Sequence, residues 1–233
     1  MSENNKEIPG KEMPAFLLAG GRPRNVDAMV CMISQAIQGI RKPQVAYIGT
    51  ANGDNPAFFH MMKLLLKQAG AGKVNFVHLA KNKPDIGKAK DALAGADLIF
   101  LSGGEVEDGM AWLERHGLIA FLKDLYNAGK RFMGVSAGVI MLGTHWVRWK
   151  TPGDDSTSEL FDCLGIIPHL FDVHGEDEDW VELKAALRLM GNGSRAYGLP
   201  RECMISADSR GTLVNLEKEY IVFVNEGGLV RIL

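Results

Sequence analysis

Residues 131–142 read Arg-Phe-Met-Gly-Val-Ser-Ala-Gly-Val-Ile-Met-Leu, in which an apolar run of strand length passes through Gly134-x-Ser136-x-Gly138 into a segment that can form a helix. A serine on such a sharp strand-to-helix turn has a strained backbone and an exposed hydroxyl. The glycines leave room for the turn, and the first N–H groups of the helix point toward a developing negative charge. This stretch therefore predicts an α/β fold with Ser136 as a candidate nucleophile.

The same alternation of strand and helix patterns runs through the first two thirds of the chain. Short apolar runs end in glycine or small polar residues, and the segments between them carry apolar residues at helical spacing. Continuous apolar strands that alternate with amphipathic helices indicate a mostly parallel sheet covered on both faces, a three-layer α-β-α sandwich. The expected strands are 15–19, 45–48, 74–77, 98–101 and 131–135, and the expected helices are 25–40, 56–69 and 118–128.

The C-terminal third has a different pattern. Two strand-like runs, 211–215 and 220–224, lie so close together that a hairpin can join them but a helical crossover cannot. We therefore expect antiparallel strands to finish the sheet. The chain has no internal repeat and no linker-like stretch, so a single α/β hydrolytic domain is predicted over residues 13–233, preceded by a flexible tail over residues 1–12.

Composition excludes several classes of partner. The chain has 233 residues and a net charge of −2, so it lacks the basic character of a nucleic-acid or membrane-surface protein. Its polar N-terminus and the lack of any apolar run of about 18 residues predict a cytoplasmic protein without a membrane span. The three cysteines form no CxxC pair, so neither a zinc site nor a disulfide framework is expected.

A second glycine-rich segment, Ser102-Gly103-Gly104-Glu105, directly follows the expected strand 98–101. Ligands of open α/β sheets bind beyond the carboxyl ends of the strands. A glycine pair at that position lets backbone N–H groups approach a ligand closely, so it can supply an oxyanion donor. A simple turn between strand and helix explains the segment equally well.

A serine nucleophile needs a base within hydrogen-bond reach, and histidine is the usual one. Of the six histidines only His145, His169 and His174 follow Ser136 in the chain. His145 falls near the end of the helix that follows the elbow. His169 and His174 belong to the next strand-like segment, where residues five apart face opposite sides. His174 lies at the carboxyl end of that segment, where the sheet places ligands, and is the candidate base.

These segments resemble the dipeptidase E and cyanophycinase-like serine peptidases, whose flavodoxin-like fold is related to the class I glutamine amidotransferases. The resemblance covers most of the chain and rests on 101–104, on the Gly-x-Ser-Ala-Gly motif at 134–138, and on 163–168 leading to His174. It implies Ser136 as nucleophile, His174 as base, the N–H groups of Gly104 and Ala137 as oxyanion hole, and Gly103 and Glu105 as substrate-binding residues.

The resemblance also implies a substrate class. Members of this family cleave peptides next to aspartate, either in small peptides or in the aspartate-arginine polymer cyanophycin. A small peptide is therefore the expected partner, no metal or organic cofactor is expected, and a homodimer is left open. Glu105 stands where relatives carry asparagine or aspartate, which leaves the substrate preference open.

The third member of a catalytic triad is less clear. Relatives carry a glutamate where this chain has Arg201, and Glu202 comes one residue late. On an extended strand that shift turns the side chain to the other face, although a bulge can restore it. Either Glu202 serves as the acid, or the triad lacks one, or another acid takes the place; those considered are Asp172, Glu176 and Asp208.

Three functions remain to be compared. The first is a serine peptidase that works through an acyl-enzyme. The second is a catalytically impaired binding or regulatory module of the same fold, motivated by Arg201, whose cation would disfavour an imidazolium beside it. The third is another hydrolase or an amidotransferase-like enzyme on the same fold, but the amidotransferases use a cysteine at the elbow where this chain has Ser136.

Overall fold

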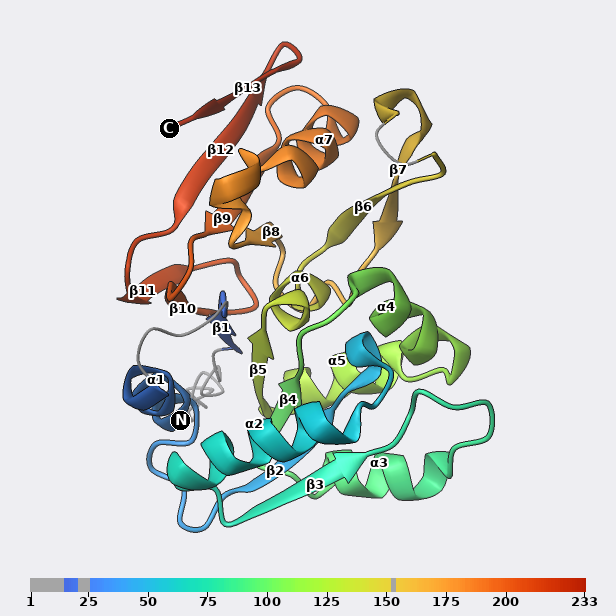
Figure 1. The fold of residues 1–233 in the computed structure, drawn as a ribbon, viewed down its shortest axis with the longest axis vertical. Helices are drawn as coiled ribbons and strands as arrows, with labels where there is room; N and C mark the ends of the chain where they lie inside the picture. The colour runs from blue at the N-terminus through green and yellow to red at the C-terminus, as the bar shows by residue number, and fades with distance from the viewer. Residues whose placement is uncertain (1–14, 21–25, 152–153) are drawn as a thin grey trace, which may run out of the picture.

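The structure is a computed structural model that describes residues 15–20, 26–151 and 154–233. The predicted tail, residues 1–12, lies outside these ranges, as do the first residues of the predicted domain. Figure 1 shows two parts stacked along the long axis: a central sheet with its helices below, and a smaller part that carries the last helix and strands above. No helix in the described ranges is long and apolar enough to cross a membrane.

The central sheet has seven strands in the order β11-β10-β1-β5-β4-β2-β3. Five of them are parallel, and β10 and β11 continue the sheet in antiparallel pairing next to β1. The predicted parallel strands are thus all present, and they place β5 beside β4 in the middle of the sheet. The strands are β1 Ala15–Leu18, β2 Gln44–Ile48, β3 Lys73–Val77, β4 Leu98–Leu101, β5 Arg131–Val135, β10 Met204–Ala207 and β11 Leu213–Glu217.

Helices cover both faces of this sheet because its strands are apolar on both sides. In β4, Leu98 and Phe100 belong to one core, while Ile99 and Leu101 belong to the other. Such alternation follows from the period of two along a strand. One core is covered by α1 Val26–Ala36 and α2 Pro56–Gln68, and the other by α3 Ile86–Ala94, α4 Val106–Arg115, α5 Ile119–Asn127 and α6 Ala137–Leu142.

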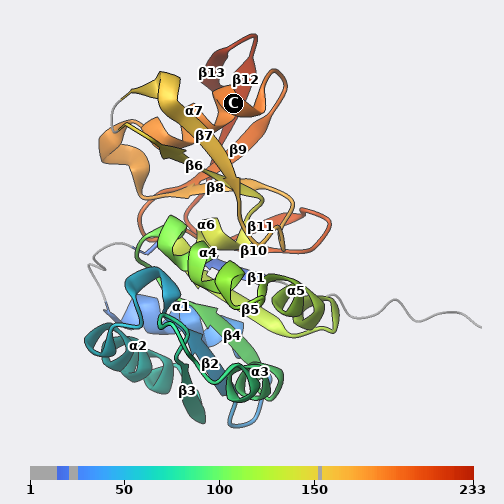
Figure 2. The ribbon, with the colours of Figure 1, turned by 90° about the vertical axis from the view of Figure 1, so that its right-hand side faces the viewer.

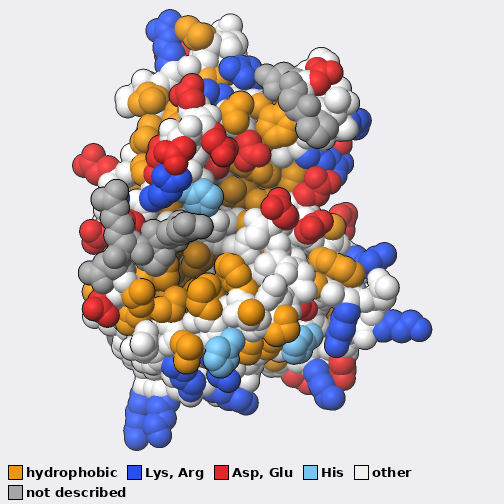
Figure 3. All heavy atoms as spheres, in the orientation of Figure 1, with side chains coloured by type: hydrophobic (Ala, Val, Ile, Leu, Met, Phe, Trp, Pro, Cys, Tyr) orange, Lys and Arg blue, Asp and Glu red, His pale blue; other side chains and the backbone are white. Residues whose placement is uncertain are grey.

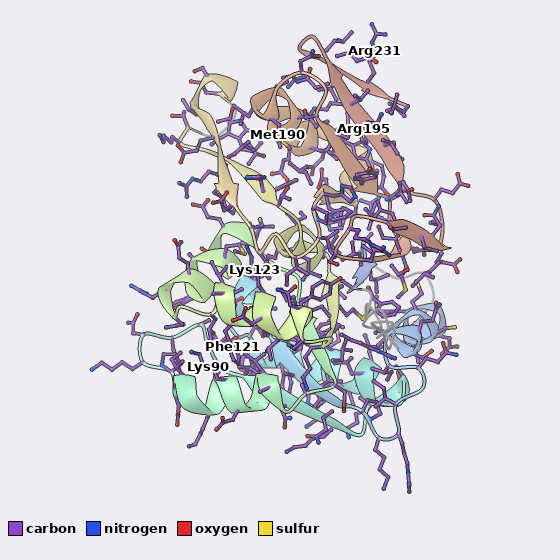
Figure 4. All side chains as sticks on the ribbon, turned by 180° about the vertical axis from the view of Figure 1, so that it is seen from behind. Lys90, Phe121, Lys123, Met190, Arg195 and Arg231 are labelled. Carbon is purple, nitrogen blue, oxygen red and sulfur yellow. The ribbon has the colours of Figure 1, made fainter. Side chains whose placement is uncertain are left out.

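Local signals in the sequence explain where several helices begin. Asn55 accepts hydrogen bonds from the N–H groups of Ala57 and Phe58, and Pro56 follows it at the first position of α2. Asp85 caps α3 in the same way through the N–H of Lys88. Seen from behind in Figure 4, Lys90 of α3 and Phe121 of α5 lie side by side, with Nζ 5.2 Å from the ring centre.

The smaller part contains a second sheet in the order β13-β12-β9-β8 and the pair β6-β7. The helix α7 Val181–Met190 joins the parallel strands β8 and β9. In Figure 2 these elements lie above α6 and the end of β1. The strands are β6 His145–Trp149, β7 Ser158–Asp162, β8 Leu170–Val173, β9 Arg195–Leu199, β12 Ile221–Glu226 and β13 Leu229–Ile232.

The prediction of a C-terminal hairpin is wrong, although both of its strands are present. β11 pairs with β10 in the central sheet, whereas β12 pairs with β9 and β13 in the second sheet. Phe223 of β12 is fully buried and its ring lies 5.7 Å from that of Trp180. Burial of this large apolar side chain in the smaller part favours the observed pairing over a local hairpin.

Candidate active site

Ser136 stands on a tight turn between β5 and α6, as the sequence predicts. Its backbone has φ +53° and ψ −122°, a conformation that costs free energy in a residue with a side chain. Its N–H donates to the carbonyl of Leu18 in β1 at 3.0 Å, which holds the turn to the neighbouring strand. The hydroxyl is thereby presented at the carboxyl end of the parallel strands.

The two glycines of the motif are required by close backbone contacts. A Cβ at position 134 would lie 2.4 Å from the carbonyl oxygen of Gly138. One at position 138 would lie 2.3 Å from the carbonyl oxygen of Leu101 in β4. Any side chain at either position would push α6 away from the sheet. The glycines therefore set the position of Ser136 relative to β4.

His174 is within hydrogen-bond distance of Ser136: Oγ and Nε2 are 2.9 Å apart. It follows β8 directly, has a left-handed backbone with φ +45°, and donates its N–H to the carbonyl of Leu199 at 2.9 Å. When Nδ1 carries the proton, Nε2 can accept the hydroxyl proton of Ser136. The structure thus brings the predicted pair together across two sheets.

The other two histidines considered in the sequence lie in different contacts. His169 places Nε2 2.7 Å from the carbonyl oxygen of Gly211. His145 opens β6, not the end of the elbow helix, and pairs with Asp162 at 3.2 Å. Neither contact involves Ser136.

Arg201 is paired with acidic residues that follow His174 in the chain. Its Nη2 donates to Asp177 at 2.6 Å, and its backbone N–H donates to Glu176 at 2.8 Å. The negative charge of Asp177 raises the pKa of Arg201, and the guanidinium lowers the pKa of Asp177 in turn. The positive charge of Arg201 is therefore balanced by Asp177 within the protein.

The candidate acids are likewise engaged elsewhere. Glu202 accepts from Lys218 at 2.8 Å and lies in a turn after β9 with φ +65°, so the side-alternation of an extended strand does not apply to it. Asp208 accepts from the N–H groups of Arg210 and Thr212. Over the described ranges, no hydrogen bond joins His174 to a carboxylate. The role of Glu202 as triad acid stays a prediction.

Gly103 and Gly104 pass close to the serine and to the loop after β2. A Cβ at position 103 would lie 3.0 Å from Cβ of Ser136, and one at position 104 would lie 2.0 Å from the carbonyl oxygen of Ala51. Gly104 also has φ +141°, a conformation natural only to glycine. Because Gly103 has no side chain, the backbone of this loop can pack directly against Ser136.

The N–H groups of Gly104 and Ala137 are suited to bind an oxyanion. The N–H of Gly104 has no acceptor among the described residues. Ala137 is the first residue of α6, where N–H groups lack an acceptor within the helix. Both residues line the cavity beside Ser136.

A buried hydrogen-bond network supports the glycine loop, and the sequence reasoning missed it. Tyr47 donates its hydroxyl to Ser102 at 2.8 Å, and Asn52 donates to Ser102 at 2.9 Å and to the carbonyl of Gly103 at 3.0 Å. Burial raises the pKa of Tyr47, so it remains a donor. The position of Asn52 just after the strand 45–48 was the signal available in the sequence.

Two cavities of about 410 Å³ each meet at Ser136, Gly104 and His174. This volume is within the range of small-molecule sites. One cavity has both charged and apolar walls, is the more polar of the two, and extends toward α4, β6 and α7. The other is mainly apolar, and its described walls come largely from α1 and α2, with Met29, Phe58, Met61, Met62 and Leu65. A substrate bound at Ser136 can therefore place one part in each.

Asp172, one of the candidate acids, is 5% exposed and lies at the end of β8 beside the polar cavity. Burial raises the pKa of its carboxyl from 3.8 to about 7, although Oδ1 accepts the N–H of Val173 at 2.7 Å. The folded protein therefore holds this proton to a higher pH than the unfolded chain does. Stability is lost as the pH rises from about 4 to about 7 and then levels off.

Asp172→Asn keeps an acceptor for Val173 and removes the ionisation. We expect the stability of the variant relative to the wild type to increase with pH. The free energy of unfolding of the variant minus that of the wild type should be about 2–4 kcal/mol larger at pH 8 than at pH 4. Urea unfolding at pH 4, 6 and 8 measures this. A difference between the two proteins that stays constant with pH would contradict the prediction.

The described residues offer little for metal or buried-thiol chemistry. In the part of the chain that the structure describes, no group of three or more His, Cys, Asp or Glu side chains is arranged to hold a metal ion. Burial raises the pKa of Cys163 and raises that of Cys203 to about 12. These two thiols are thus poor nucleophiles.

Comparisons with known proteins agree with this architecture. The sequence model of peptidase family S51 matches residues 15–214. The structure of a peptidase from an acI-B1 Actinobacterium is similar over 95% of this chain and 93% of its own, with a TM-score of 0.70 and 21% identity. That of a putative peptidase E protein from Listeria monocytogenes EGD-e is similar over 89% of this chain and 99% of its own, with a TM-score of 0.67 and 17% identity. No curated protein sequence matches. The predicted fold class and the predicted family resemblance are confirmed.

Proposed function

Since the chain belongs to peptidase family S51, we propose that Ser136 and His174 perform its hydrolysis of small peptides through an acyl-enzyme. Membership of this family makes the chain a serine peptidase. The observation that carries the proposal is the 2.9 Å contact between Ser136 Oγ and His174 Nε2 on a strained turn. A nucleophile and a base within hydrogen-bond reach are the core of this chemistry.

The geometry suits the following steps. His174 Nε2 takes the proton of Ser136 as Oγ attacks the peptide carbonyl. The N–H groups of Gly104 and Ala137 donate to the oxyanion of the tetrahedral intermediate. His174 then returns the proton to the leaving amine, and the acyl group stays on Oγ. Water then attacks the acyl carbonyl while His174 takes its proton, and His174 gives that proton to Oγ as the C–Oγ bond breaks, which releases the acid and restores the serine.

A covalent probe tests the proposed nucleophile without requiring a known substrate. A diphenyl phosphonate forms a bond from Ser136 Oγ to phosphorus and releases phenol, since His174 takes the serine proton and the phenoxide leaves. We expect the protein to gain the mass of one phosphonyl group, and peptide mapping to place it on Ser136 rather than on the neighbouring Ser102. Modification of another residue, or none, would contradict the proposal.

Aspartyl peptides are the substrate class that the family resemblance implies, and we propose them as the reference substrates for turnover. The impaired binding module remains a second candidate because no described carboxylate hydrogen-bonds His174. The loss of the acid costs roughly 10⁴-fold in turnover in a well-studied protease. Rapid labelling of Ser136 with no release of amine from any peptide would favour the binding module.

A further inference from the structure

The polar cavity beside Ser136 is lined by an excess of acidic side chains. Its lining contains four carboxylates and a single guanidinium, from Glu105, Glu107, Asp172, Glu182 and Arg148. These residues come from the start of α4, from β6, from the end of β8 and from the start of α7. Figure 3 shows acidic side chains gathered at mid-height of this face, between α4 and α7.

The positive charge of Arg148 is already neutralised within the protein. It forms salt bridges with Glu107 at 2.9 Å and with Glu159 at 2.7 Å. These two carboxylates raise the pKa of Arg148. Arg148 is therefore a poor site for a further carboxylate from a substrate, because that group would compete with two acids already in place.

Glu105 and Glu182 lack such partners. Over the described residues, neither carboxylate forms a salt bridge or a side-chain hydrogen bond. Glu182 instead faces other acids: burial raises its pKa first, and the charges of Glu178 and Glu105 raise it further. Like charges that approach one another without a cation between them are unfavourable. A positively charged ligand would relieve this repulsion.

The cavity also has walls that suit a cation with an apolar stem. Trp146 and Trp149 of β6 line it together with Val147 and Ile140. Tryptophan faces attract ammonium and guanidinium groups. The apolar walls can pack against the methylene groups that carry such a charge.

We propose, on the basis of the serine peptidase function above, that this cavity binds a positively charged group of the substrate and that Glu105 and Glu182 select for it. The group is an ammonium or guanidinium, supplied either by the N-terminus of a peptide or by a Lys or Arg side chain. The side chain of an aspartyl residue is disfavoured here and would have to lie outside the cavity.

Matched peptides test this selection. In each pair Lys is replaced by norleucine, which keeps the methylene stem and removes the charge, on either side of the scissile bond. We expect kcat/KM to be higher for the charged peptide by on the order of 10–100-fold, the range of a charge-assisted hydrogen bond. Free and N-acetylated forms of each peptide distinguish the N-terminal ammonium from the side chain as the source of the charge.

Variants assign the selection to the two glutamates. In the double variant Glu105→Gln/Glu182→Gln, we expect the kcat/KM values of the charged and neutral peptides to lie within about 3-fold of each other, the small difference left when an ion pair is lost. Glu114→Gln, an exposed acid at the far end of α4, is the matched control and should keep the full preference. A preference that survives the double substitution would overturn the assignment.

Phosphonates separate this inference from the proposed function. A probe with an aminobutyl side chain and one with a butyl side chain are compared by their rates of labelling Ser136. If both probes label Ser136 at equal rates and the charged and neutral peptides are cleaved equally well, this inference alone is overturned. Failure of both probes to label Ser136 overturns the proposed function and this inference with it.

Discussion

Ser136→Ala is expected to lower kcat for a cleaved peptide by on the order of 10⁴-fold or more, with the fold unchanged. The substitution removes the hydroxyl oxygen that forms the acyl-enzyme in the proposed mechanism, while the proposed oxyanion donors and both cavities remain. Alanine keeps a Cβ, so the strained backbone at φ +53° and the contacts around it persist. Substrate binding should therefore change far less than turnover.

Amine release from a panel of peptides, together with thermal unfolding, measures this prediction. Ser34→Ala is the matched control, because Ser34 lies on α1 and its hydroxyl donates to the carbonyl of Cys31. The control should retain wild-type turnover. If Ser136→Ala kept turnover within tenfold of wild type, Ser136 would not be the nucleophile.

Gly138→Ala is expected to have the second largest effect, and on both stability and activity. The new Cβ would lie 2.3 Å from the carbonyl oxygen of Leu101, so α6 or β4 must move. Such overpacking against backbone costs about 2–3 kcal/mol, or about 5–10 °C in melting temperature for a chain of this size. Because α6 carries the Ala137 N–H and follows Ser136 directly, kcat should fall by about 100-fold.

Gly87→Ala is the matched control for this substitution. Gly87 also lies in a helix, α3, but the nearest atom to its new Cβ would be 3.5 Å away, an ordinary contact. This variant should unfold at the same temperature as the wild type or slightly higher, since alanine favours helix. Equal behaviour of the two variants would show that the close contact at Gly138 is tolerated, against the prediction.

The local patterns of the sequence were enough to predict the central architecture. Five parallel strands and the elbow are short-range signals, since apolar runs, glycines and helical spacing are all read within about 15 residues. The candidate pair Ser136 and His174 followed from the rule that sites lie at the carboxyl ends of strands, and the structure places the two atoms 2.9 Å apart.

Tertiary structure alone decided where the later strands pair and which charges meet. β11 and β12 are adjacent in the chain but belong to different sheets, because burial of Phe223 against Trp180 outweighs a local hairpin. Arg201 and Glu202 are adjacent in the sequence, but Arg201 pairs with Asp177 and Glu202 pairs with Lys218. Their positions in the sequence did not predict these partners.

The charge of the cavity could likewise not be predicted from the sequence. Glu105 is at the N-cap position of α4 and Glu182 lies in the first turn of α7, and each alone looks like an acid that favours a helix N-terminus. Only packing of the smaller part over the central sheet brings them to one cavity at Ser136. Local propensity acts between near neighbours in the chain, whereas electrostatic and packing energies act between whatever the fold places in contact.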